Sequence, residues 1–356
     1  MSTSKGKVLL TGHSGYIGSV MGPRLMAEGY QVLGLDTGYY GEECKFGSDE
    51  AQVPAINKDI RDLSVDDLQG FDTLIHLAAL SNDPLGNLKE DWTYDINHHA
   101  SVRLARLAKQ SGVRRFLFSS SCSMHGANSA AKVDETSPVE PVTPYGDSKI
   151  RAEQEISKMA DDAFSPIFLR NGTVYGVSPR LRVDIVLNNL VGWAHTTGKV
   201  KLYTDGSPWR PLIHVEDVCS AFIAAMEAPV KVVHNQVFHV GSNKENYQIR
   251  QLAEIVCSVV PGSSIEYVND HQADQRTYIA DFTKIATQLP GFQPKWTVEA
   301  GARQLYQAYQ AANMTLEEFT GSRYIRLKRI DELLQSGQLD TSLRWRKAPV
   351  ETLPSR

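Results

Sequence analysis

The first forty residues constrain the fold of this chain more than any other segment. A short apolar run, residues 7–10, leads into the glycine-rich segment 11–18, and apolar residues at helical spacing follow it. A second apolar run, residues 31–35, ends in Asp36. A strand, a glycine-rich turn, a helix and a second strand with a terminal carboxylate are typical of the βαβ unit that binds a dinucleotide. The segment therefore predicts an α/β protein with a parallel sheet.

Three glycines and Asp36 indicate how this turn would hold its ligand. Gly12 permits a tight turn, Gly15 lets the backbone approach a pyrophosphate at the helix N-terminus, and Gly18 lets the helix lie close to the sheet. Asp36 can accept hydrogen bonds from the adenosine ribose and would repel a 2′-phosphate. Residues 37–40 include no Lys or Arg that could hold such a phosphate. The sequence therefore predicts NAD as the cofactor rather than NADP.

Further strands and helices follow at the spacing of a doubly wound Rossmann sheet. Apolar segments at 53–57 and 73–77 predict strands, and residues 97–110 place apolar side chains on one helical face, with Gly112 as the expected stop. Ligands of such sheets lie outside the carboxyl ends of the strands. Additional NAD contacts are expected in the turn and near these ends, from Tyr16, Ile17, Asp59, Ile60, Leu77, Ala78, Ala79 and Asn97.

A hydroxyl, a phenol and an ammonium group follow in the next part of the chain. The segment 116–121 predicts a strand whose carboxyl end carries Ser121, and Tyr145 and Lys149 lie four residues apart on one face of a later helix. A phenol with its usual pKa of about 10 is a poor base at neutral pH. An ammonium group and a nicotinamide cation nearby would lower that pKa, so that Tyr145 could remove a hydroxyl proton while hydride leaves the same carbon for NAD. Ser121 would hold the substrate hydroxyl against Tyr145.

The composition indicates which kinds of partner and which cellular compartment the sequence favours. With 37 Lys and Arg against 41 Asp and Glu, the net charge of −4 argues against a nucleic-acid or anionic-membrane surface. The chain has no run of about 18 apolar residues that would span a membrane, and its N-terminus resembles no secretory signal. The 4 Cys show no CxxC spacing and the 10 His no HExxH motif, so neither a disulfide framework nor a metal site is expected. These features predict a cytoplasmic protein.

The glycine turn, Asp36, the three catalytic candidates and the segment Arg210-Pro-Leu-Ile-His-Val-Glu-Asp217 together resemble the extended short-chain dehydrogenase/reductase family, over roughly residues 5–310. Within that family the chain is most similar to the nucleoside-diphosphate-sugar epimerases and dehydratases. The resemblance implies that Tyr145 is the acid/base, that Lys149 binds the nicotinamide ribose and that Ser121 orients a sugar hydroxyl. It also implies a nucleoside-diphosphate sugar as substrate, with contacts from Ser81, Cys122, Ser123, Thr173, Arg210 and Arg276.

Residues 122 and 123 distinguish between members of this family. Its 4,6-dehydratases place an Asp-Glu pair directly after the catalytic Ser or Thr, whereas this chain has Cys122 and Ser123. Dehydration by that route is not expected. Epimerases that oxidise and re-reduce C4 need no second acid/base pair, and a preference for NAD favours such a redox-neutral reaction. The Cys122 thiol could serve as a further acid or base, although a small half-buried residue behind Ser121 is the simpler interpretation.

Several alternatives to an epimerase stay open at this point. A nucleotide-sugar 4-dehydrogenase or 4-ketoreductase would use the same groups without epimerisation. A reductase of a non-sugar alcohol or ketone would have an apolar cleft without need of Arg210, and a nucleotide-sensing protein would need neither Tyr145 nor Lys149. The pattern of residues names neither the sugar nor the nucleotide base.

The expected organisation is an NAD-binding domain beside a smaller α/β domain for the substrate. The first domain spans residues 1–174 and is rejoined by about 212–241, and the second consists of 175–211 and 242–315. Residues 316–356 form a helical extension whose basic side chains are expected to be solvated, or alternatively to cover the site or a partner subunit: Arg323, Arg326, Lys328 and Arg329. By the same resemblance, the helices at 97–110 and 148–160 imply a homodimer.

Overall fold

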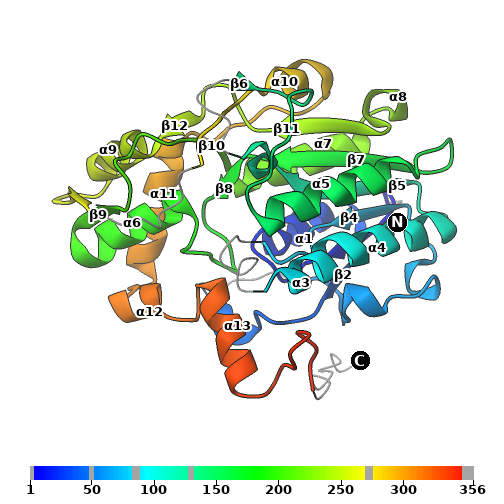
Figure 1. Cartoon of the computed structure of the whole chain (residues 1–356), viewed down its shortest axis with the longest axis horizontal. Coiled ribbons are helices and arrows are strands. Elements are labelled where there is room, and N and C mark those ends of the chain that lie inside the picture. Colours follow the sequence, from blue (N-terminus) through cyan, green and yellow to red (C-terminus); the bar gives the residue numbers. More distant parts are fainter. Residues whose placement is uncertain (1–3, 48–51, 82–88, 127–131, 269–275, 347–356) are drawn as a thin grey trace.

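The computed structural model describes residues 4–47, 52–81, 89–126, 132–268 and 276–346, and its central feature is a seven-stranded parallel sheet (Figure 1). The strand order is β11-β7-β5-β4-β1-β2-β3, with every neighbouring pair parallel. The strands are β1 (Lys7–Thr11), β2 (Gln31–Asp36), β3 (Ala55–Asn57), β4 (Thr73–His76), β5 (Arg115–Ser121), β7 (Ser165–Asn171) and β11 (Gln236–Val240). The predicted doubly wound α/β fold is confirmed.

The strand order reverses direction in the middle of this sheet. From β1 the chain continues through β2 to β3 on one side, whereas β4, β5, β7 and β11 extend the sheet on the other side. Ligands of open α/β sheets bind at such a reversal, outside the carboxyl ends of the strands. The glycine-rich turn directly follows β1, so the topology places it where a ligand is expected.

Helices cover both faces of the sheet (Figure 1). On one face α1 (Gly18–Ala27) and α7 (Val215–Glu227) share a core with Leu10, and on the other α4 (Ser101–Gln110) and α5 (Pro144–Ser157) share a core with Leu9. Consecutive strand residues point to opposite faces, which is why Leu9 and Leu10 belong to different cores. Burial on both faces explains why these strands are nearly continuous apolar runs in the sequence.

Three predicted elements differ in their bounds from the structure, and one of them is the helix expected over 148–160, which is α5 (Pro144–Ser157). The helix expected over 97–110 begins earlier, because α3 (Glu90–Thr93) and the π-helix η4 (Tyr94–Ala100) lead directly into α4. Trp92 and Ile96 are buried in the same core as α4, so tertiary packing extends the helix beyond its periodic part. The strand expected over 53–57 is shortened to β3 at the sheet edge, where Pro54 lacks an amide hydrogen for the ladder.

Smaller sheets and helices lie beside the carboxyl ends of the central strands (Figure 1). β10 (Trp209–His214) pairs with β8 (Thr173–Tyr175) and β12 (Asn246–Gln248), while β9 pairs with β13 and β6 with β14. The other elements of this part and of the connections are β6 (Lys132–Val133), β9 (Lys199–Leu202), β13 (Ser264–Tyr267), β14 (Ile279–Ala280), α6 (Val186–Thr197), α8 (Val230–Val233), α9 (Ile249–Val259), α10 (Thr283–Gln288), α11 (Val298–Ala311), η1 (Glu42–Cys44), η2 (Ile60–Asp62), η3 (Asp66–Leu68) and η5 (Cys122–His125). The division of the chain into two domains stays a prediction.

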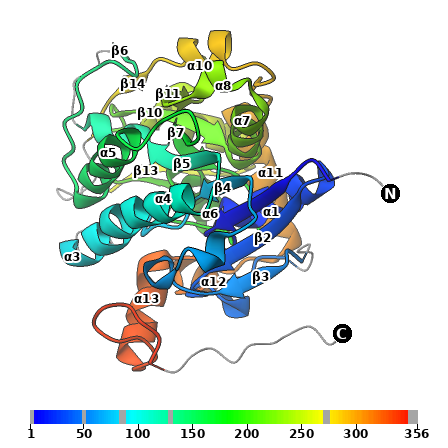
Figure 2. The ribbon, with the colours of Figure 1, turned by 90° about the vertical axis from the view of Figure 1, so that its right-hand side faces the viewer.

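The C-terminal extension differs from the expectation of a solvated surface. It contains α12 (Leu316–Thr320) and α13 (Arg326–Gln335), which lie in the lower part of Figure 2. α13 buries Ile330 and Leu333 in the core that contains Leu9. Arg326 is only 3% exposed, whereas Arg323 and Lys328 are exposed. The solvated interpretation is therefore wrong for Arg326, because the first turn of α13 packs against the body of the protein.

The described ranges contain no helix that is both long and apolar enough to cross a bilayer. In those ranges, no three His, Cys, Asp or Glu side chains gather as metal ligands would. Cys44, Cys122, Cys219 and Cys257 are free thiols.

Candidate active site

A cavity of about 1160 Å³, hereafter the cleft, opens at the carboxyl ends of the central strands. The glycine-rich turn, the end of β5, the start of α5 and parts of the smaller sheets form its walls. The predicted site residues that line it are Gly12, Gly15, Tyr16, Ile17, Gly18, Asp36, Asp59, Ile60, Leu77, Ala78, Ala79, Ser81, Ser121, Ser123, Tyr145, Lys149, Thr173, Arg210 and Arg276. Two others, Asn97 and Cys122, are not part of its lining. A single cleft thus unites groups that were assigned separately to cofactor, chemistry and substrate.

The glycine-rich turn leaves no room for side chains. Gly12 has a φ of 75°, and a Cβ there would lie 2.7 Å from the Ala78 amide nitrogen. A Cβ at Gly18 would lie 2.1 Å from the Gly12 carbonyl oxygen. The bare backbone is open to a ligand at the N-terminus of α1, where the helix dipole favours a phosphate. These residues fit the pyrophosphate of a dinucleotide.

Asp36 ends β2 beside this turn. Its carboxylate accepts hydrogen bonds from the backbone amides of Ser14, at 3.2 Å, and Gly38, at 2.9 Å. These two bonds hold the carboxylate in the cleft wall. A carboxylate has lone pairs beyond those two bonds, and ribose hydroxyls can donate to them. The arrangement therefore suits an adenosine ribose with free hydroxyls, as in NAD.

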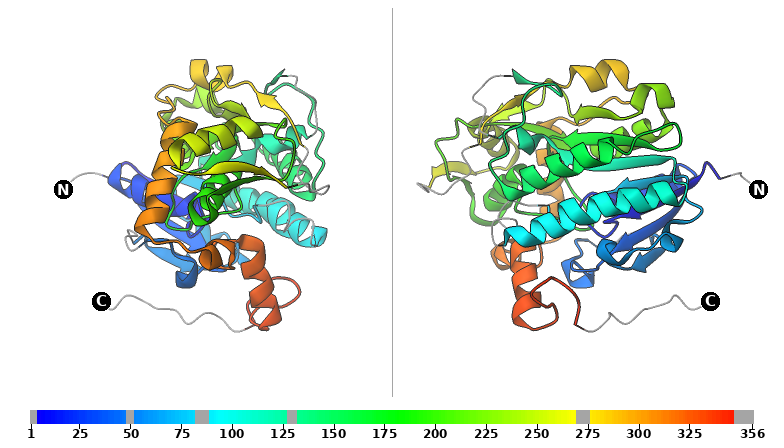
Figure 3. Two further views of the ribbon diagram at one scale, coloured as in Figure 1. Left: turned by 90° about the vertical axis from the view of Figure 1, so that its left-hand side faces the viewer. Right: turned by 45° about the vertical axis from the view of Figure 1, so that its right-hand side comes forward.

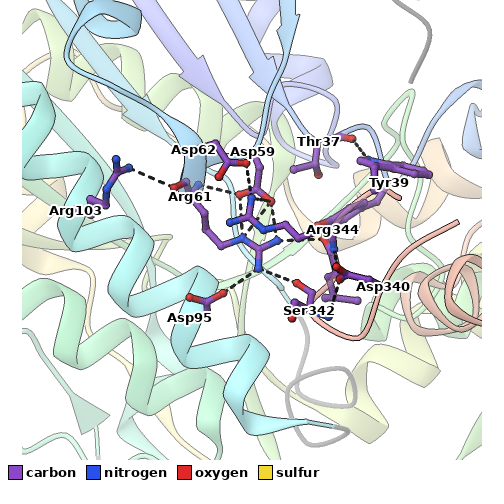
Figure 4. A network of polar contacts seen from close by, with 12 residues as sticks. Thr37, Tyr39, Asp59, Arg61, Asp62, Asp95, Arg103, Asp340, Ser342 and Arg344 are labelled. Carbon is purple, nitrogen blue, oxygen red and sulfur yellow. Dashed lines mark hydrogen bonds and ion pairs between the residues drawn. The ribbon is translucent and has the colours of Figure 1, made fainter. Parts of the chain in front are cut away.

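Asp59 lies at the edge of the cleft within a network of charged groups (Figure 4). Its carboxylate accepts hydrogen bonds from Arg61 Nε at 3.0 Å and Nη2 at 2.7 Å, and it lies 3.2 Å from Nη1 of Arg344. Arg61 also donates to Asp95 at 2.8 Å. Two guanidinium groups thus already bind Asp59, and its contact with NAD stays a prediction.

The start of α5 places the phenol and the ammonium group. Thr143 caps this helix by accepting a hydrogen bond from the Gly146 amide at 3.2 Å, and Pro144 occupies the first helical position. The helix therefore begins immediately before Tyr145, and Lys149 follows one turn later on the same face. Both side chains line the cleft.

Lys149 is 2% exposed beneath the phenol ring. Its Nζ donates a hydrogen bond to the Ser119 carbonyl oxygen at 2.8 Å and lies 5.9 Å from the centre of the Tyr145 ring. Burial lowers the pKa of Lys149 to about 8, although the Glu153 carboxylate opposes this shift. The amine is therefore still charged at neutral pH and can stabilise a phenolate.

Two hydroxyls meet where β5 ends. Ser121 Oγ accepts a hydrogen bond from the Ser123 amide at 3.2 Å, and the two Oγ atoms are 2.9 Å apart. Because η5 begins directly after Ser121, the tight turn brings both side chains to the cleft. Hydroxyls can donate and accept, so this pair is suited to orient a substrate hydroxyl near Tyr145.

Cys122 and Asn97 lie behind the cleft. Cys122 is fully buried, its thiol donates to the Arg170 carbonyl oxygen at 3.1 Å, and burial raises its pKa. Asn97 is also buried, and its amide exchanges hydrogen bonds of 2.8 Å and 3.0 Å with the backbone of Leu80. This placement gives no support to a thiol acid or base. It makes Asn97 a support for the segment that carries Ser81.

Arg210 and Arg276 meet in the wall of the cleft although they lie 66 positions apart in the sequence. Arg210 is 8% exposed, and its Nη1 donates to the Trp209 carbonyl oxygen at 2.9 Å and to the Arg276 carbonyl oxygen. The Trp209 amide in turn donates to Thr277 Oγ1 at 3.0 Å, which joins the two segments. A guanidinium group can donate hydrogen bonds to two phosphate oxygens at once, so this wall of the cleft fits a diphosphate.

Sequence reasoning missed several polar residues that the fold adds to the cleft: Asn171, Arg182, Asn189 and Lys201. It named Arg326, which also lines the cleft, only as one of four basic residues that were expected to be solvated or alternatively to cover the site. Arg182 forms a two-bond pair with Asp184, at 3.0 Å and 2.8 Å, and donates to Ser81 Oγ at 3.1 Å. The charged residues that alternate with apolar ones in segment 180–184 were a usable signal for Arg182. No local signal separates Arg326 from the basic residues around it.

Comparisons with known proteins identify the family of this chain. The sequence profile of the NAD dependent epimerase/dehydratase family matches residues 8–241. UDP-glucuronate 4-epimerase of Thermodesulfobacterium geofontis is 26% identical over 318 residues, which cover 84% of this chain and 94% of the relative. UDP-glucose 4-epimerase of Lactobacillus helveticus is 29% identical over 316 residues, which cover 81% and 92%. The solved structure of MoeE5 in complex with UDP-glucuronic acid and NAD has a TM-score of 0.73 at 26% identity and covers 86% of this chain and 100% of that one.

The matched residues include the glycine-rich turn, Asp36, the Ser121, Tyr145 and Lys149 set, and Arg210. The structure gathers all of these in one cleft. The predicted NAD dependence is confirmed together with the predicted class of enzyme. The chain belongs to the NAD dependent epimerase/dehydratase family.

Proposed function

We propose that this protein epimerises a nucleoside-diphosphate sugar by oxidising its C4 hydroxyl and reducing the ketone from the opposite face. One observation carries the proposal: Tyr145, Lys149 and Ser121 line the same cavity as the joined pair Arg210 and Arg276. A proton acceptor and a diphosphate site in one cleft suit a substrate that has a hydroxyl to oxidise and two phosphates to hold. The 4-epimerase activities in the names of two relatives support this assignment.

Each side chain of the site has its own role in moving the proton or in stabilising charge. When bound, NAD supplies the acceptor and then the donor of hydride at the substrate carbon. Tyr145 takes the proton of the C4 hydroxyl and returns it in the reductive step. The Lys149 ammonium, whose Nζ is 5.9 Å from the ring centre, favours the phenolate form of Tyr145. Ser121 orients the hydroxyl, with Ser123 fixing the Ser121 side chain through their 2.9 Å contact.

Positions 122 and 123 separate this reaction from a dehydration. Loss of water from the sugar needs an acid for the leaving hydroxyl and a base for the neighbouring carbon. Cys122 is buried behind the cleft with a raised pKa, and Ser123 offers only a hydroxyl. Neither residue supplies a carboxylic acid, which favours a path that stops at the C4 ketone before re-reduction.

We also propose a cytoplasmic homodimer. The dimer would pair through α4 and α5, which pack together on one face of the sheet, with Tyr94 of η4 donating to Asp147 of α5 at 2.8 Å. This proposal is supported by the resemblance of these two helices to the helix pair through which the subunits of related proteins dimerise. The four free thiols support a reducing compartment. Light scattering of the purified chain tests the dimer, and a mass of 39.5 kDa would contradict it.

The activity is tested by adding nucleotide-sugars to NAD-loaded protein, beginning with UDP-glucose and UDP-glucuronic acid. Product stereochemistry is followed by NMR and the nicotinamide by its absorbance. A stereoisomeric sugar without accumulating NADH establishes the epimerase. Stoichiometric NADH together with a keto-sugar would instead show the 4-dehydrogenase or 4-ketoreductase alternative. No change with any nucleotide-sugar would contradict a sugar substrate.

A further inference from the structure

The first turn of α13 lies in the wall of the cleft. Ile325, Arg326 and Leu327 all line the cavity. The helix is 10 residues long, its N-cap residue Ile325 makes no side-chain cap, and its first turn contains no acidic residue. The free amide groups at the start of a helix usually donate to a capping side chain or an acidic side chain, and the helix dipole adds positive potential there. This helix start is therefore electropositive and faces the cavity without a side-chain acceptor of its own.

Arg326 adds a buried positive charge at the same place. Its Nη2 donates to the Arg180 carbonyl oxygen at 2.9 Å, and its guanidinium carbon lies 3.9 Å from the centre of the Tyr40 ring. In the part of the chain that the structure describes, Nη1 has no hydrogen-bond partner and no carboxylate pairs with this side chain. Buried charges in proteins are generally paired, because an isolated one is costly. A 97%-buried arginine in the wall of a cleft, which no carboxylate among the described residues pairs with, points to an anionic ligand.

The neighbours of Arg326 belong to the cofactor half of the cleft. Tyr40, beneath its guanidinium group, follows Asp36 by four residues, and Asp36 contacts the glycine-rich turn through the Ser14 amide. Figures 1 and 2 place α13 below the sheet and β10, which carries Arg210, near the top. In both views of Figure 3, α13 is the red-orange helix at the bottom, well separated from the yellow and green helices at the top. An anion bound by Arg326 would therefore lie in the cofactor half of the cleft, away from Arg210.

We propose that Arg326 and the first turn of α13 bind the pyrophosphate of NAD. The glycine-rich turn and the C-terminal extension would then hold the pyrophosphate from two sides. Arg326 lies beyond residues 8–241, which the family profile matches, so this contact is a property of the extension. The proposal rests on the proposed function only for the presence of NAD in the cleft.

The extension is anchored on the residues that follow β2. Arg329 donates to the Tyr39 carbonyl oxygen at 3.3 Å and pairs with Glu43, and Trp345 Nε1 donates to the Thr37 carbonyl oxygen at 2.6 Å. Figure 4 shows Arg344 beside Asp59 and Asp62, with Asp340 and Ser342 close by. The extension residues that make these contacts all follow Arg326 in the chain. They hold the first turn of α13 in place before a ligand arrives.

The test uses the full chain freed of nucleotide and measures binding by calorimetry, without turnover. The probes are ADP-ribose, which contains the pyrophosphate, AMP, which lacks it, and UDP, which represents the substrate. The Arg326→Gln variant is expected to bind ADP-ribose about 10- to 100-fold more weakly, which is the usual effect of losing a charged hydrogen bond. AMP and UDP affinities should change by less than about threefold.

The matched control is Arg323→Gln on the same extension. Arg323 is exposed and pairs with Glu318 at 3.1 Å outside the cleft, so its loss should leave all three affinities unchanged. Unchanged ADP-ribose binding by Arg326→Gln would overturn the proposal. A selective loss of UDP affinity would overturn it as well and would assign the anion to the sugar nucleotide. Wild-type binding of ADP-ribose without any sugar turnover would refute the proposed function and leave this proposal standing.

Thermal unfolding separates a ligand role from a structural one. If Arg326 is an uncompensated charge without NAD, replacing it with Met should raise the melting temperature of the nucleotide-free protein or leave it unchanged. The same variant should show a smaller upward shift on adding NAD than the wild type. A variant that melts earlier without NAD but keeps the full NAD shift would show that Arg326 serves the fold only. Arg326→Lys, which keeps the charge, should recover part of the shift.

Discussion

Lys149 and Arg326 are both buried cations in the wall of one cleft, but they respond to burial in different ways. Lys149 donates to a backbone carbonyl, and burial lowers its pKa to about 8, so it is close to losing its proton. Burial also lowers the pKa of Arg326, but a guanidinium group starts so high that it stays charged at any ordinary pH. The end of the cleft that contains Tyr145 therefore holds an adjustable charge, and the end beside α13 holds a permanent one.

The largest effect is expected where the adjustable charge acts on chemistry. Tyr145→Phe removes the phenol oxygen and keeps the ring above Lys149, so turnover should fall by about 10³-fold. ADP-ribose binding should stay within about twofold, because the hydroxyl is not part of the pyrophosphate site. Product formation by NMR and calorimetry give the two readouts.

The control for this variant is Tyr267→Phe, since Tyr267 lies on β13 and is not part of the cleft lining. It should keep full turnover. Turnover of Tyr145→Phe within tenfold of the wild type would contradict the acid/base role of Tyr145. It would also remove the reason for a lysine at position 149.

The pH dependence of stability tests the difference between the two cations directly. The folded pKa of Lys149, about 8, lies below the unfolded value of about 10.4, so the unfolded chain binds more protons between these values. The contribution of Lys149 to stability therefore rises with pH across this window. The free energy of unfolding of the wild type, minus that of Lys149→Met, should increase by about 3 kcal/mol from pH 8 to pH 10.4.

Urea unfolding at several pH values measures that difference. The corresponding difference for Arg326→Met should be constant over the same window, because Arg326 does not titrate there. Equal slopes for the two variants would show that the two buried cations do not differ as the structure indicates.

His76 extends the comparison to a buried base that is neutral in the folded state. Its ring nitrogens contact Thr11 Oγ1 at 2.7 Å and Ser101 Oγ at 2.8 Å, and burial together with the Lys149 charge lowers its pKa to about 3. Below the unfolded pKa of about 6.5 the unfolded chain binds more protons, so stability falls as pH falls, by about 1.4 kcal/mol per pH unit from this group.

Replacing His76 with Gln should therefore flatten the decline of stability between pH 6.5 and pH 5, as measured by urea unfolding. The control is His99, which is exposed, and the His99→Gln variant should keep the wild-type slope. A wild-type slope in His76→Gln would assign the acid sensitivity to other groups.

The smallest effect is expected behind Ser121 and Ser123. Cys122→Ala removes a buried sulfur that does not line the cleft, so kcat should stay within about twofold while stability falls by about 1 kcal/mol. Steady-state kinetics and urea unfolding measure the two quantities. A tenfold loss of kcat at unchanged fold would restore the thiol as an acid or base.

Much of the cofactor site could be predicted because its parts are close together in the chain. The glycine turn and Asp36 fall within one βαβ unit, and Tyr145 and Lys149 fall on one helical face. Their geometry follows from local periodicity and turn chemistry, which the residue pattern contains. Asn97 and Cys122 show the limit of such reasoning, since each lies next to the site in sequence but is not part of the cleft lining.

The parts that could not be predicted depend on contacts between distant segments. Nothing local joins Arg210 to Arg276, or selects Arg326 for burial among four basic residues. The direction of a long side chain at a helix start depends on what packs against it, and Tyr40 and Arg180 do so from more than a hundred residues away.

The amino-acid sequence by itself determined the parallel sheet, the cofactor turn and the spacing of the reacting groups, because strands, turns and helix faces follow from short-range patterns. Only the tertiary structure decided which charges are buried together in the cleft and which remain in water. Burial and its electrostatic consequences depend on the whole packed chain, so they cannot be assigned to a residue from its neighbours in sequence.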